Sequence, residues 1–357
     1  MDYRVGCDAH KHFSQFAVLD QAGRLLGQHR IDHDPGAIRG FLEKFPGGTP
    51  VALESVGNWY WIADEIEAAG CRPLLTHAAK AKVMMGNVNK TDKLGARGLA
   101  QLLHLGSLPS VWLPPAEVRD ERELPRTRMA FAAWRTAVKN RIHASLAKYA
   151  LITRDHSDIF AGGGRAWLEQ AVTQLPAETR RCVTQELGLL DTLQEHIRQL
   201  EKRIRQRTDH TPGLQLLKTL PGVGDILALV IDREIGSIDR FGTPGQLASY
   251  AGVVPQVRSS AGKTHFGHLR KPACQYLKWA FIEAANVIVL HHRHPAWRTK
   301  YVTQIYRRVA RRKGHAIAVG AVAHHLAEAA FWVLKRAEPY RPPASQQASP
   351  KPASGRA

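Results

Sequence analysis

The sequence has few cysteines, and they lie far apart. Cys7, Cys71, Cys182 and Cys274 are the only four in 357 residues, and none belongs to a C-x-x-C pair. Isolated thiols of this kind predict neither a disulfide framework nor a zinc site. We therefore expect a protein of a reducing compartment, the cytoplasm.

Long hydrophobic runs are also lacking. No apolar stretch approaches the roughly 20 residues that a bilayer-spanning helix needs. The opening MDYRVGCDAHK moves directly into a strand pattern, without the pattern of a signal peptide. The sequence therefore predicts no membrane partner.

Acidic residues are the third shortage. Asp and Glu number 31 against 50 Lys and Arg, which gives a formal net charge of +19. A basic surplus of this size, in a chain with 44% hydrophobic residues, favours a nucleic-acid partner because phosphates attract clustered Lys and Arg. The length of 357 residues is enough for two or three domains.

The first third of the chain has the pattern of a mixed α/β unit. Short apolar runs joined by tight turns predict three strands in a meander, and later strands alternate with helices. Such alternation is typical of a sheet with parallel members. The expected strands are 3–7, 16–19, 24–30, 50–53 and 72–75, and the expected helices are 35–45 and 59–69.

Three carboxylates stand at the boundaries of these elements. Asp8 follows the first expected strand, Glu54 ends the fourth, and Asp92 precedes a helix that runs to about Leu103. Functional groups gather at the carboxyl ends of parallel strands. Three converging carboxylates repel one another unless a divalent cation neutralises them, and Mg²⁺ prefers such oxygen ligands. The pattern favours metal-dependent phosphoryl transfer, although Asp92 alone is equally well explained as a helix cap.

The middle of the chain is predicted to be helical. Residues 126–151 have apolar positions mostly three and four apart, and a second helical run begins at about Ala177. The segment Ala161-Gly162-Gly163-Gly164 predicts a break between the two. A near-heptad stripe in the second run predicts a coiled-coil-like contact, either within the chain or between protomers. Its members are Leu187, Leu190, Leu193, Ile197, Leu200 and Ile204.

A glycine turn opens the last third. The segment Pro221-Gly222-Val223-Gly224 precedes an apolar helix and resembles a helix-hairpin-helix motif. Backbone N–H groups at such a turn bind phosphates without reading sequence, so Gly222 and Gly224 are candidate nucleic-acid contacts. A tight turn between two packed helices requires the same glycines, and both interpretations stay open.

Two adjacent serines lie in a basic stretch without carboxylates. We expect residues 253–271 to form a loop that displays Ser259 and Ser260. Hydroxyls among cations suit a phosphate, whereas serines that cap or turn an ordinary surface loop are the alternative. The basic residues of the stretch are Arg258, Lys263, Arg270 and Lys271.

The N-terminal motifs resemble those of a bacterial insertion-sequence transposase family. They are VGCDAHK around Asp8, ALESVGNWYW around Glu54 and NKTDKLGARGLAQLL around Asp92. That family carries an Asp-Glu-Asp-Asp set on a ribonuclease H-like fold similar to the RuvC Holliday-junction resolvase. It includes the bridge-RNA-guided recombinases and the Piv invertase. The resemblance implies that Asp8, Glu54 and Asp92 are catalytic ligands of Mg²⁺.

One position departs from the family pattern. The family's last motif is K-T-D-x-x-D-A, whereas this chain has Gly95 at the place of the fourth acid. A missing ligand weakens one metal position. The departure therefore leaves open a catalytically impaired nucleic-acid-binding derivative.

The C-terminal third resembles the second domain of the same family. The matching stretches include RFGTPGQLASYAGVVPQVRSSAGK, LRKPACQYLKWAFIEAAN and RKGHAIAVGAVAHHLAEAAF. In that family a serine five residues after the proline of a G-[LV]-x-P element is the nucleophile. The resemblance implies that this residue is Ser260, with Ser259 as second choice, although Ala261 replaces the glycine that usually follows. Lys263, Arg270 and Lys271 are then expected at the phosphate.

The resemblance covers nearly all of residues 1–335 and completes the prediction. The expected domains are a RuvC-like carboxylate domain (1–108), a helical linker or coiled coil (109–208), a mainly α-helical transposase domain (209–337) and a disordered tail (338–357). The expected activity is DNA transposition through a covalent phosphoserine. The expected partners are DNA, a guide (bridge) RNA and further copies of the chain, as a dimer or tetramer, in the bacterial cytoplasm at the nucleoid. A structure-specific nuclease that uses water instead of serine is the alternative.

Overall fold

The computed structural model describes residues 2–86, 92–209, 211–260, 263–269 and 273–343. The side chains of 92–93, 258–260 and 263–266 lie outside this description. The chain forms two compact units, Met1–Ala116 and Glu117–Ala357, and each is described by itself.

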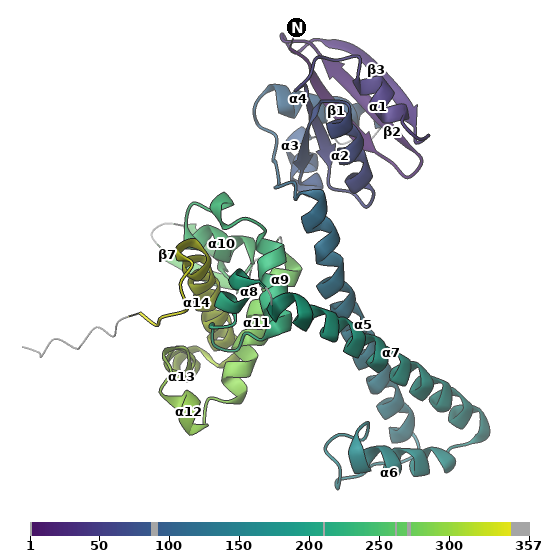
Figure 1. Ribbon diagram of the computed structural model, residues 1–357, viewed down its shortest axis with the longest axis vertical. Helices are drawn as coiled ribbons and strands as arrows, with labels where there is room; N and C mark the ends of the chain where they lie inside the picture. Colours follow the sequence, from purple (N-terminus) through teal and green to yellow (C-terminus); the bar gives the residue numbers. More distant parts are fainter. Residues whose placement is uncertain (1, 87–91, 210, 261–262, 270–272, 344–357) are drawn as a thin grey trace, which may run out of the picture. The chain divides into compact units, whose positions relative to one another are not determined.

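The first unit contains a five-stranded mixed sheet in the order β3-β2-β1-β4-β5 (Figure 1). The pairs β1–β2 and β2–β3 are antiparallel, whereas β1–β4 and β4–β5 are parallel. The predicted meander and the predicted parallel members are therefore both confirmed. The strands are β1 (Arg4–Ala9), β2 (Phe13–Leu19), β3 (Leu25–Asp32), β4 (Pro50–Glu54) and β5 (Arg72–Thr76).

Helices cover both faces of this sheet. Alternation along β1 sends Val5 and Cys7 into a core with α1 and α2. The opposite face is covered by α4, which packs on Ala17 and Leu19 of β2. Gly6 of β1 permits this contact, because a Cβ there would lie 2.1 Å from a backbone oxygen of α4. The helices are α1 (Ala37–Leu42), α2 (Trp59–Ala68), α3 (Ala78–Met85) and α4 (Asp92–His104).

The second unit begins with an antiparallel helical hairpin (Figure 1). Three ion pairs join its long helices in a steady antiparallel register, at Glu121–Arg207, Arg128–Glu201 and Arg141–Glu186. The predicted break between the helical runs is present but lies earlier, over 148–161, because α6 starts at Gly162, directly after the extended residue Ala161. The helices are α5 (Ala116–Ala147), α6 (Gly162–Thr173) and α7 (Ala177–Asp209).

The apolar stripe of α7 is used within the chain. Leu187 and Leu190 pack in one core with Ile142 and Leu146 of α5. Leu193, Ile197 and Ile204 are buried and Leu200 is half-buried. The structure thus shows the hairpin alternative for this stripe.

The rest of the second unit is a helical domain with one β-hairpin. Its core combines α8, α9, α10, α11, α13 and α14. The bounds are α8 (Pro212–Leu217), α9 (Asp225–Ile235), η1 (Ile238–Arg240), α10 (Pro244–Tyr250), β6 (Pro255–Ser260), β7 (Lys263–Leu269), α11 (Gln275–Leu290), α12 (Pro295–Arg298), α13 (Tyr301–Lys313) and α14 (His315–Arg336).

The last helix is unusually apolar. The helix α14 is long and apolar enough to span a bilayer, with a mean hydropathy of 1.5 over its most apolar window. Just over half of that window is buried inside the unit, where α14 packs against α10, α11 and α13. Packing in the core therefore accounts for its apolar character.

The segment after α14 folds back onto the unit. Tyr340 donates its backbone N–H to Thr219 at 2.8 Å, and its hydroxyl lies 3.0 Å from Nε2 of His325. Burial raises the pKa of Tyr340 to about 12. The disorder predicted from residue 338 is therefore wrong at Tyr340, which is anchored, and 344–357 lie outside the described residues.

Candidate active site

Asp8 lies inside β1 and not after it, which corrects the predicted boundary. The strand continues to Ala9, and Asp8 pairs with Gln15 of β2. Asp8 is 6% exposed and Gln15 is 5% exposed. The strand extends further than its apolar run because β2 supplies pairing partners up to Ser14. A buried carboxylate within a central strand requires a compensating polar or cationic environment.

Glu54 lies beside Asp8 on the neighbouring strand. Cys7 of β1 is in parallel register with Leu53 of β4, so Asp8 and Glu54 are the next residues on the two strands. Adjacent strands are roughly 4.8 Å apart, and residues in the same register share a face. The structure therefore brings these two predicted residues together on the sheet face that α4 covers.

Cys7 lies close enough to both carboxylates for their charge to affect the pKa of its thiol. Burial, opposed by a hydrogen bond to Ser14 and assisted by the nearby carboxylates of Asp8 and Glu54, raises the pKa of the Cys7 thiol to about 12. Two negative groups within reach disfavour a thiolate. Cys7 is thus a neutral structural thiol beneath an acidic centre.

Gly95 touches Asp8 directly. A Cβ built on Gly95 would lie 2.3 Å from Oδ2 and 3.1 Å from Cγ of Asp8. Position 95 therefore faces the acidic centre, as the family motif implies for its fourth acid. Any side chain at this position displaces the Asp8 carboxylate from its present rotamer. Glycine at 95 consequently removes one acid and also lets the α4 backbone approach Asp8.

Asp92 is the first residue of α4, one helical turn before Gly95. A turn advances about 5.4 Å and returns to the same helix face. The start of α4 thus lies at the acidic centre, while the Asp92 side chain is outside the described residues. Among the side chains that the structure does describe, no three His, Cys, Asp or Glu residues form a metal-binding group.

Two neighbours of Asp8 were missed from the sequence. The Nε2 atom of His10 lies 3.7 Å from Oδ2 of Asp8, and its ring stacks on Phe13. Asn58 donates to the backbone oxygen of His10 at 2.7 Å, which ties the β1–β2 turn to the start of α2. Gln15 is the second missed neighbour. The only available signals were the D-x-H spacing and a polar residue within the apolar run FSQFAVL.

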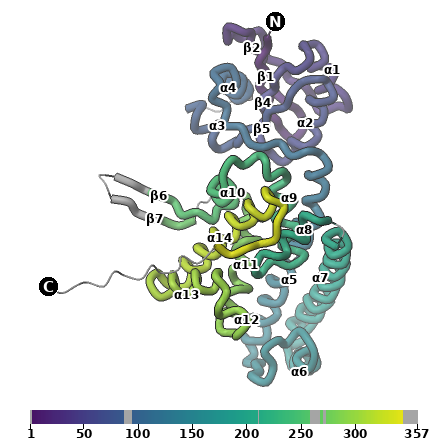
Figure 2. Tube along the Cα trace, turned by 60° about the vertical axis from the view of Figure 1, so that its left-hand side comes forward, coloured from purple at the N-terminus to yellow at the C-terminus, as the bar shows by residue number. Residues whose placement is uncertain are grey.

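Ser259 and Ser260 end a strand, which corrects the expected loop. The segment forms the hairpin β6–β7, in which Ser259 pairs with Thr264 and Ser260 with Lys263. Figure 2 shows the first part of β6 and the last part of β7 extending from the helices of the second unit. The sequence hid this hairpin because its strands pair only with each other and Val257 is 57% exposed. Where a strand has no side packed against a core, no alternating apolar pattern is imposed on its sequence.

The base of the hairpin is fixed in the core. Val253 is 1% exposed, and Cys274 donates its backbone N–H to Tyr250 at 3.0 Å. The backbone of Lys263 lies opposite Ser260, whereas Arg270 and Lys271 lie outside the described residues. Asp8 and Ser260 belong to different units.

The glycine turn joins α8 to α9, and its two glycines differ. Gly222 has φ +82°, and a Cβ there would lie 2.3 Å from the backbone oxygen of Ala284 in α11. Close helix packing is therefore sufficient reason for Gly222. Gly224 precedes α9 with open space around it, beside a surface pocket that also contains Lys218 and Lys300. Lys218 is paired with Asp225 at 2.7 Å.

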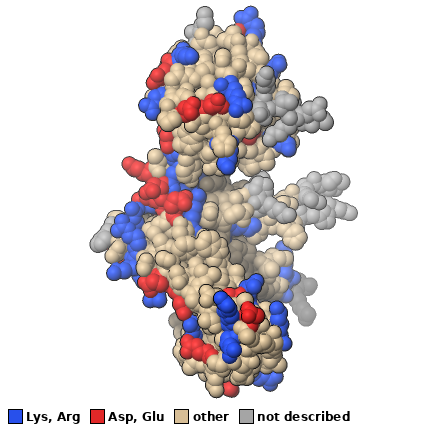
Figure 3. All heavy atoms as spheres, turned by 90° about the vertical axis from the view of Figure 1, so that its right-hand side faces the viewer, with Lys and Arg blue, Asp and Glu red and all other residues tan. Residues whose placement is uncertain are grey.

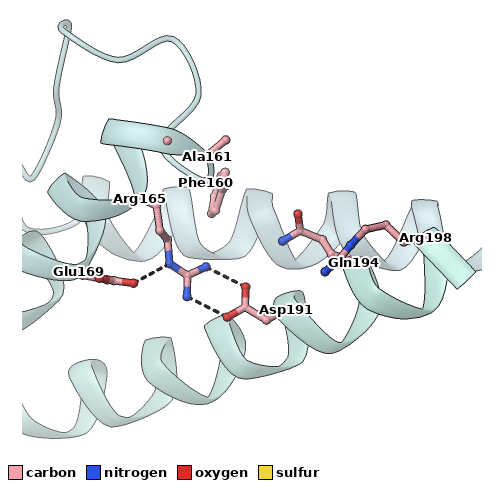
Figure 4. Close-up of a pocket in the computed structure, with 8 residues that line it drawn as sticks. Phe160, Ala161, Arg165, Glu169, Asp191, Gln194 and Arg198 are labelled. Carbon is pink, nitrogen blue, oxygen red and sulfur yellow. Dashed lines mark hydrogen bonds and ion pairs between the residues drawn. The ribbon is translucent and has the colours of Figure 1, made fainter.

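Another surface pocket lies between α6 and α7 (Figure 4). Arg165 makes two hydrogen bonds of 2.8 Å to Asp191 and one of 2.9 Å to Glu169. These bonds raise the pKa of Arg165, that to Asp191 most. The central cation of the pocket is thus neutralised by the protein, and no residue predicted from the sequence lines it.

Comparison with known proteins gives two family matches in sequence order. Residues 5–151 match a model described as a transposase of the Asp-Glu-Asp-Asp type named for IS110. Residues 214–302 match the model described as "Transposase IS116/IS110/IS902 family". With the mixed sheet and its paired carboxylates, these matches define the class as DNA transposase.

Similar proteins carry corresponding names. A "Probable family 20 transposase" of Pseudomonas aeruginosa is 25% identical over 346 residues, 95% of this chain and 98% of the relative. The "Transposase for insertion sequence element IS1111A" of Coxiella burnetii is 25% identical over 344 residues, 94% of this chain and 91% of the relative. An IS110 insertion-element protein of Streptomyces coelicolor is 32% identical over 146 residues, 41% and 35% of the two chains. Over both matched stretches the chain is therefore similar to transposases of the IS116/IS110/IS902 family.

Proposed function

We propose that this transposase cuts and rejoins DNA through a covalent phosphoserine intermediate, with Ser260 as nucleophile and Mg²⁺ as cofactor. The observation that supports the proposal most is the pairing of Asp8 and Glu54 on adjacent parallel strands, against the first turn of α4. The basic hairpin that carries Ser260 supplies the second half of the chemistry.

The acidic centre fits a hard divalent cation. Asp8 and Glu54 offer carboxylate oxygens from one sheet face, which are the donors that Mg²⁺ prefers. Asp92, at the start of α4, is the proposed third ligand. Bound Mg²⁺ would supply Lewis-acid polarisation of a phosphate. Gly95 contributes no oxygen, so the proposed site has three acids in place of four.

Ser260 performs the proposed covalent step. Its Oγ forms a bond to phosphorus, while the bond from phosphorus to the leaving sugar oxygen breaks. The hydroxyl proton passes to water, and the leaving oxygen takes up a proton. Lys263, Arg270 and Lys271 balance the charge that develops on the phosphoryl oxygens. The phosphoserine ester retains the bond energy that rejoining requires, which water attack would lose.

The proposed partners follow from the charge and the resemblance. A net charge of +19 suits two polyanions, the DNA and a guide RNA of the bridge-RNA type. Gly224, with Gly222 beside it, is the proposed backbone contact of the helix-hairpin-helix turn. We expect the chain to work as a dimer or tetramer in the bacterial cytoplasm, where subunits combine the two halves of the site.

A denaturing gel tests the covalent step. Wild-type protein, supercoiled donor DNA, Mg²⁺ and the transcripts flanking the gene are incubated, and DNA that migrates with protein is scored. The adduct should form with wild type and with Ser259→Ala, and should vanish with Ser260→Ala. Retention of the adduct in Ser260→Ala, with loss in Ser259→Ala, would move the nucleophile by one residue.

Two other functions make different predictions. A structure-specific nuclease would still cut DNA as Ser260→Ala and would form no adduct. A catalytically impaired derivative, favoured by Gly95, would bind nucleic acid and form no adduct as wild type. Because position 95 contacts Asp8, recovery of cleavage in Gly95→Asp but not in Gly95→Ala would identify the impaired form.

A further inference from the structure

The region around α12 and α13 carries an unbalanced positive charge. No Asp or Glu occurs from 284 to 327, a stretch that contains eight Lys and Arg residues. They are Arg293, Arg298, Lys300, Arg307, Arg308, Arg311, Arg312 and Lys313. The acid nearest in sequence on either side is Glu283 or Glu328, so this charge has no local counterpart along the chain.

Three arginines of α13 are exposed and lack a carboxylate partner. Arg308, Arg311 and Arg312 are exposed, and within the described part of the chain no ion pair involves them. On the long helices of the same unit, by contrast, Arg128 and Arg141 are each paired with a glutamate. We call Arg308, Arg311 and Arg312 the α13 basic face.

The fold fixes this face toward solvent. Val302, Thr303 and Ile305 are the buried residues of α13, which packs against α14. Arg308 and Arg312 are one turn apart and line a surface groove with Ile317 and Ala321 of α14. Like charges at this spacing repel by a few tenths of a kcal/mol. The helix bears that repulsion with no compensating acid, so an external polyanion would stabilise it.

A nucleic acid suits this face better than an anionic membrane. A helix that lies on a bilayer needs apolar side chains beside its basic ones, but the apolar side of α13 is buried in the core. Among the groove residues, Ile317 is the large apolar side chain that is mostly exposed, at 55%. Arginine is also the side chain best shaped for bidentate phosphate contacts.

We propose that the α13 basic face binds the phosphate backbone of duplex DNA. An α-helix is 10–12 Å in diameter, roughly the width of the major groove of B-form DNA, whereas the major groove of A-form RNA is too narrow for side chains to read. This proposal depends on the chain acting on DNA. It does not depend on Ser260 as nucleophile, because DNA binding does not require cleavage.

Binding of full-length protein to a short duplex DNA, measured by fluorescence anisotropy without Mg²⁺ across a range of salt, tests the proposal. The variant Arg308→Gln/Arg311→Gln/Arg312→Gln loses three phosphate contacts. The slope of log K against log salt should then become shallower by about 2.7, and affinity at low salt should fall at least about tenfold.

A matched variant removes the same charge elsewhere. Arg181→Gln/Lys202→Gln/Arg203→Gln neutralises three exposed cations of α7, whose neighbouring turns contain Glu178, Glu195 and Glu201. This control should keep most of the salt slope. Equal losses in both variants would assign the effect to net charge and overturn the proposal, as would no loss in either.

Two further measurements separate folding and ligand class. The charge-preserving Arg308→Lys/Arg311→Lys/Arg312→Lys variant should bind nearly as wild type. If the triple glutamine variant fails to fold, single arginine-to-glutamine variants replace it. Each of them should make the salt slope shallower by about 0.9 relative to the lysine variant. Duplex RNA and vesicles of phosphatidylserine and phosphatidylcholine form the other arms. A larger α13-dependent change with either of them than with DNA would overturn the proposal.

Discussion

The acidic centre and the serine hairpin are built in opposite ways. Asp8 is nearly buried on a central strand, between neighbouring strands and beneath α4, whereas Ser260 ends a strand that pairs with one partner only. One half of the proposed chemistry is thus held by a packed core, and the other half is presented on a projecting hairpin. The contrast teaches that a central strand fixes the position of its carboxylate through packing on both sides, whereas the end of a two-stranded hairpin has far fewer neighbours to hold it.

Asp8→Asn, in the packed half of the proposed site, is expected to have the largest effect, which is on DNA cleavage. It keeps the shape of the side chain but removes the charge that a metal ligand needs, so DNA cleavage should fall at least about 100-fold while DNA affinity is retained. Cleavage of supercoiled DNA and anisotropy measure the two quantities. Asp20→Asn is the control, because Asp20 lies in a turn of the same domain, where it accepts backbone hydrogen bonds and pairs with the exposed Arg24. An Asp8→Asn variant that cleaves DNA as fast as wild type would contradict the proposal that Asp8 is a catalytic carboxylate.

Gly6→Ala tests how tightly the core holds the acidic half. The added Cβ would lie 2.1 Å from the backbone oxygen of Ala96 and 2.6 Å from the nitrogen of Ala100, so α4 has to move. Overpacking of this kind should lower the free energy of unfolding by about 1–3 kcal/mol in chemical denaturation.

Gly40→Ala is the matched change in the same domain. A Cβ at Gly40 meets nothing within 4 Å, and this exposed position lies in α1. Its unfolding free energy should rise by up to about 1 kcal/mol, since alanine favours helices. If the two variants were equally stable, the close approach of α4 to β1 would be wrong.

Substitutions at position 95 test how the acidic centre responds to crowding of Asp8 and to an added carboxylate. Gly95→Ala adds only the Cβ that displaces the Asp8 carboxylate, and cleavage should fall about tenfold, a loss of about 1.4 kcal/mol of transition-state stabilisation. Gly95→Asp adds the same Cβ together with a carboxylate. It should therefore cleave faster than Gly95→Ala at equal Mg²⁺. The reverse order would show that crowding of Asp8 outweighs an added ligand.

The smallest expected effect concerns Cys7. Its folded pKa is raised to about 12 from an ordinary value of 9.0. A raised folded pKa means that the contribution to stability is complete below about pH 9 and is lost as the pH rises toward 12. Above pH 9 the unfolding free energy should fall more steeply for wild type than for Cys7→Ala, by up to about 1.4 kcal/mol per pH unit. Equal pH slopes in the two variants would show that folding does not raise the pKa of Cys7, which would contradict its burial beside the acidic centre.

Much of the first unit could be predicted from its sequence. Apolar runs and turns located all five strands, and the register of parallel strands explains why Asp8 and Glu54 meet. The contact between Gly95 and Asp8 was not predictable, because a glycine gives no sign of what its missing side chain would touch. The partnership of His10 with Asp8 depends on the β1–β2 turn, which short-range patterns do not determine.

The second unit was less predictable in its details. The stripe of α7 identified a helix contact but not whether the partner was α5 or another copy. The serine hairpin was hidden by Pro255, by the glycines at 262 and 267 and by strands that pair only with each other, with Val257 exposed. Basic side chains show a third limit. Figure 3 shows Lys and Arg interspersed with Asp and Glu over much of one face, and sequence alone does not tell which cations have partners.

Mass spectrometry of the protein–DNA adduct tests the central claim most directly. Wild-type protein and Asp8→Asn are each incubated with supercoiled DNA, Mg²⁺ and flanking transcripts, then digested to locate the nucleotide-bearing peptide. The account predicts a phosphodiester on Ser260 in wild type and none in Asp8→Asn. An adduct that forms equally in Asp8→Asn, or that lies outside the β6–β7 hairpin, would contradict it.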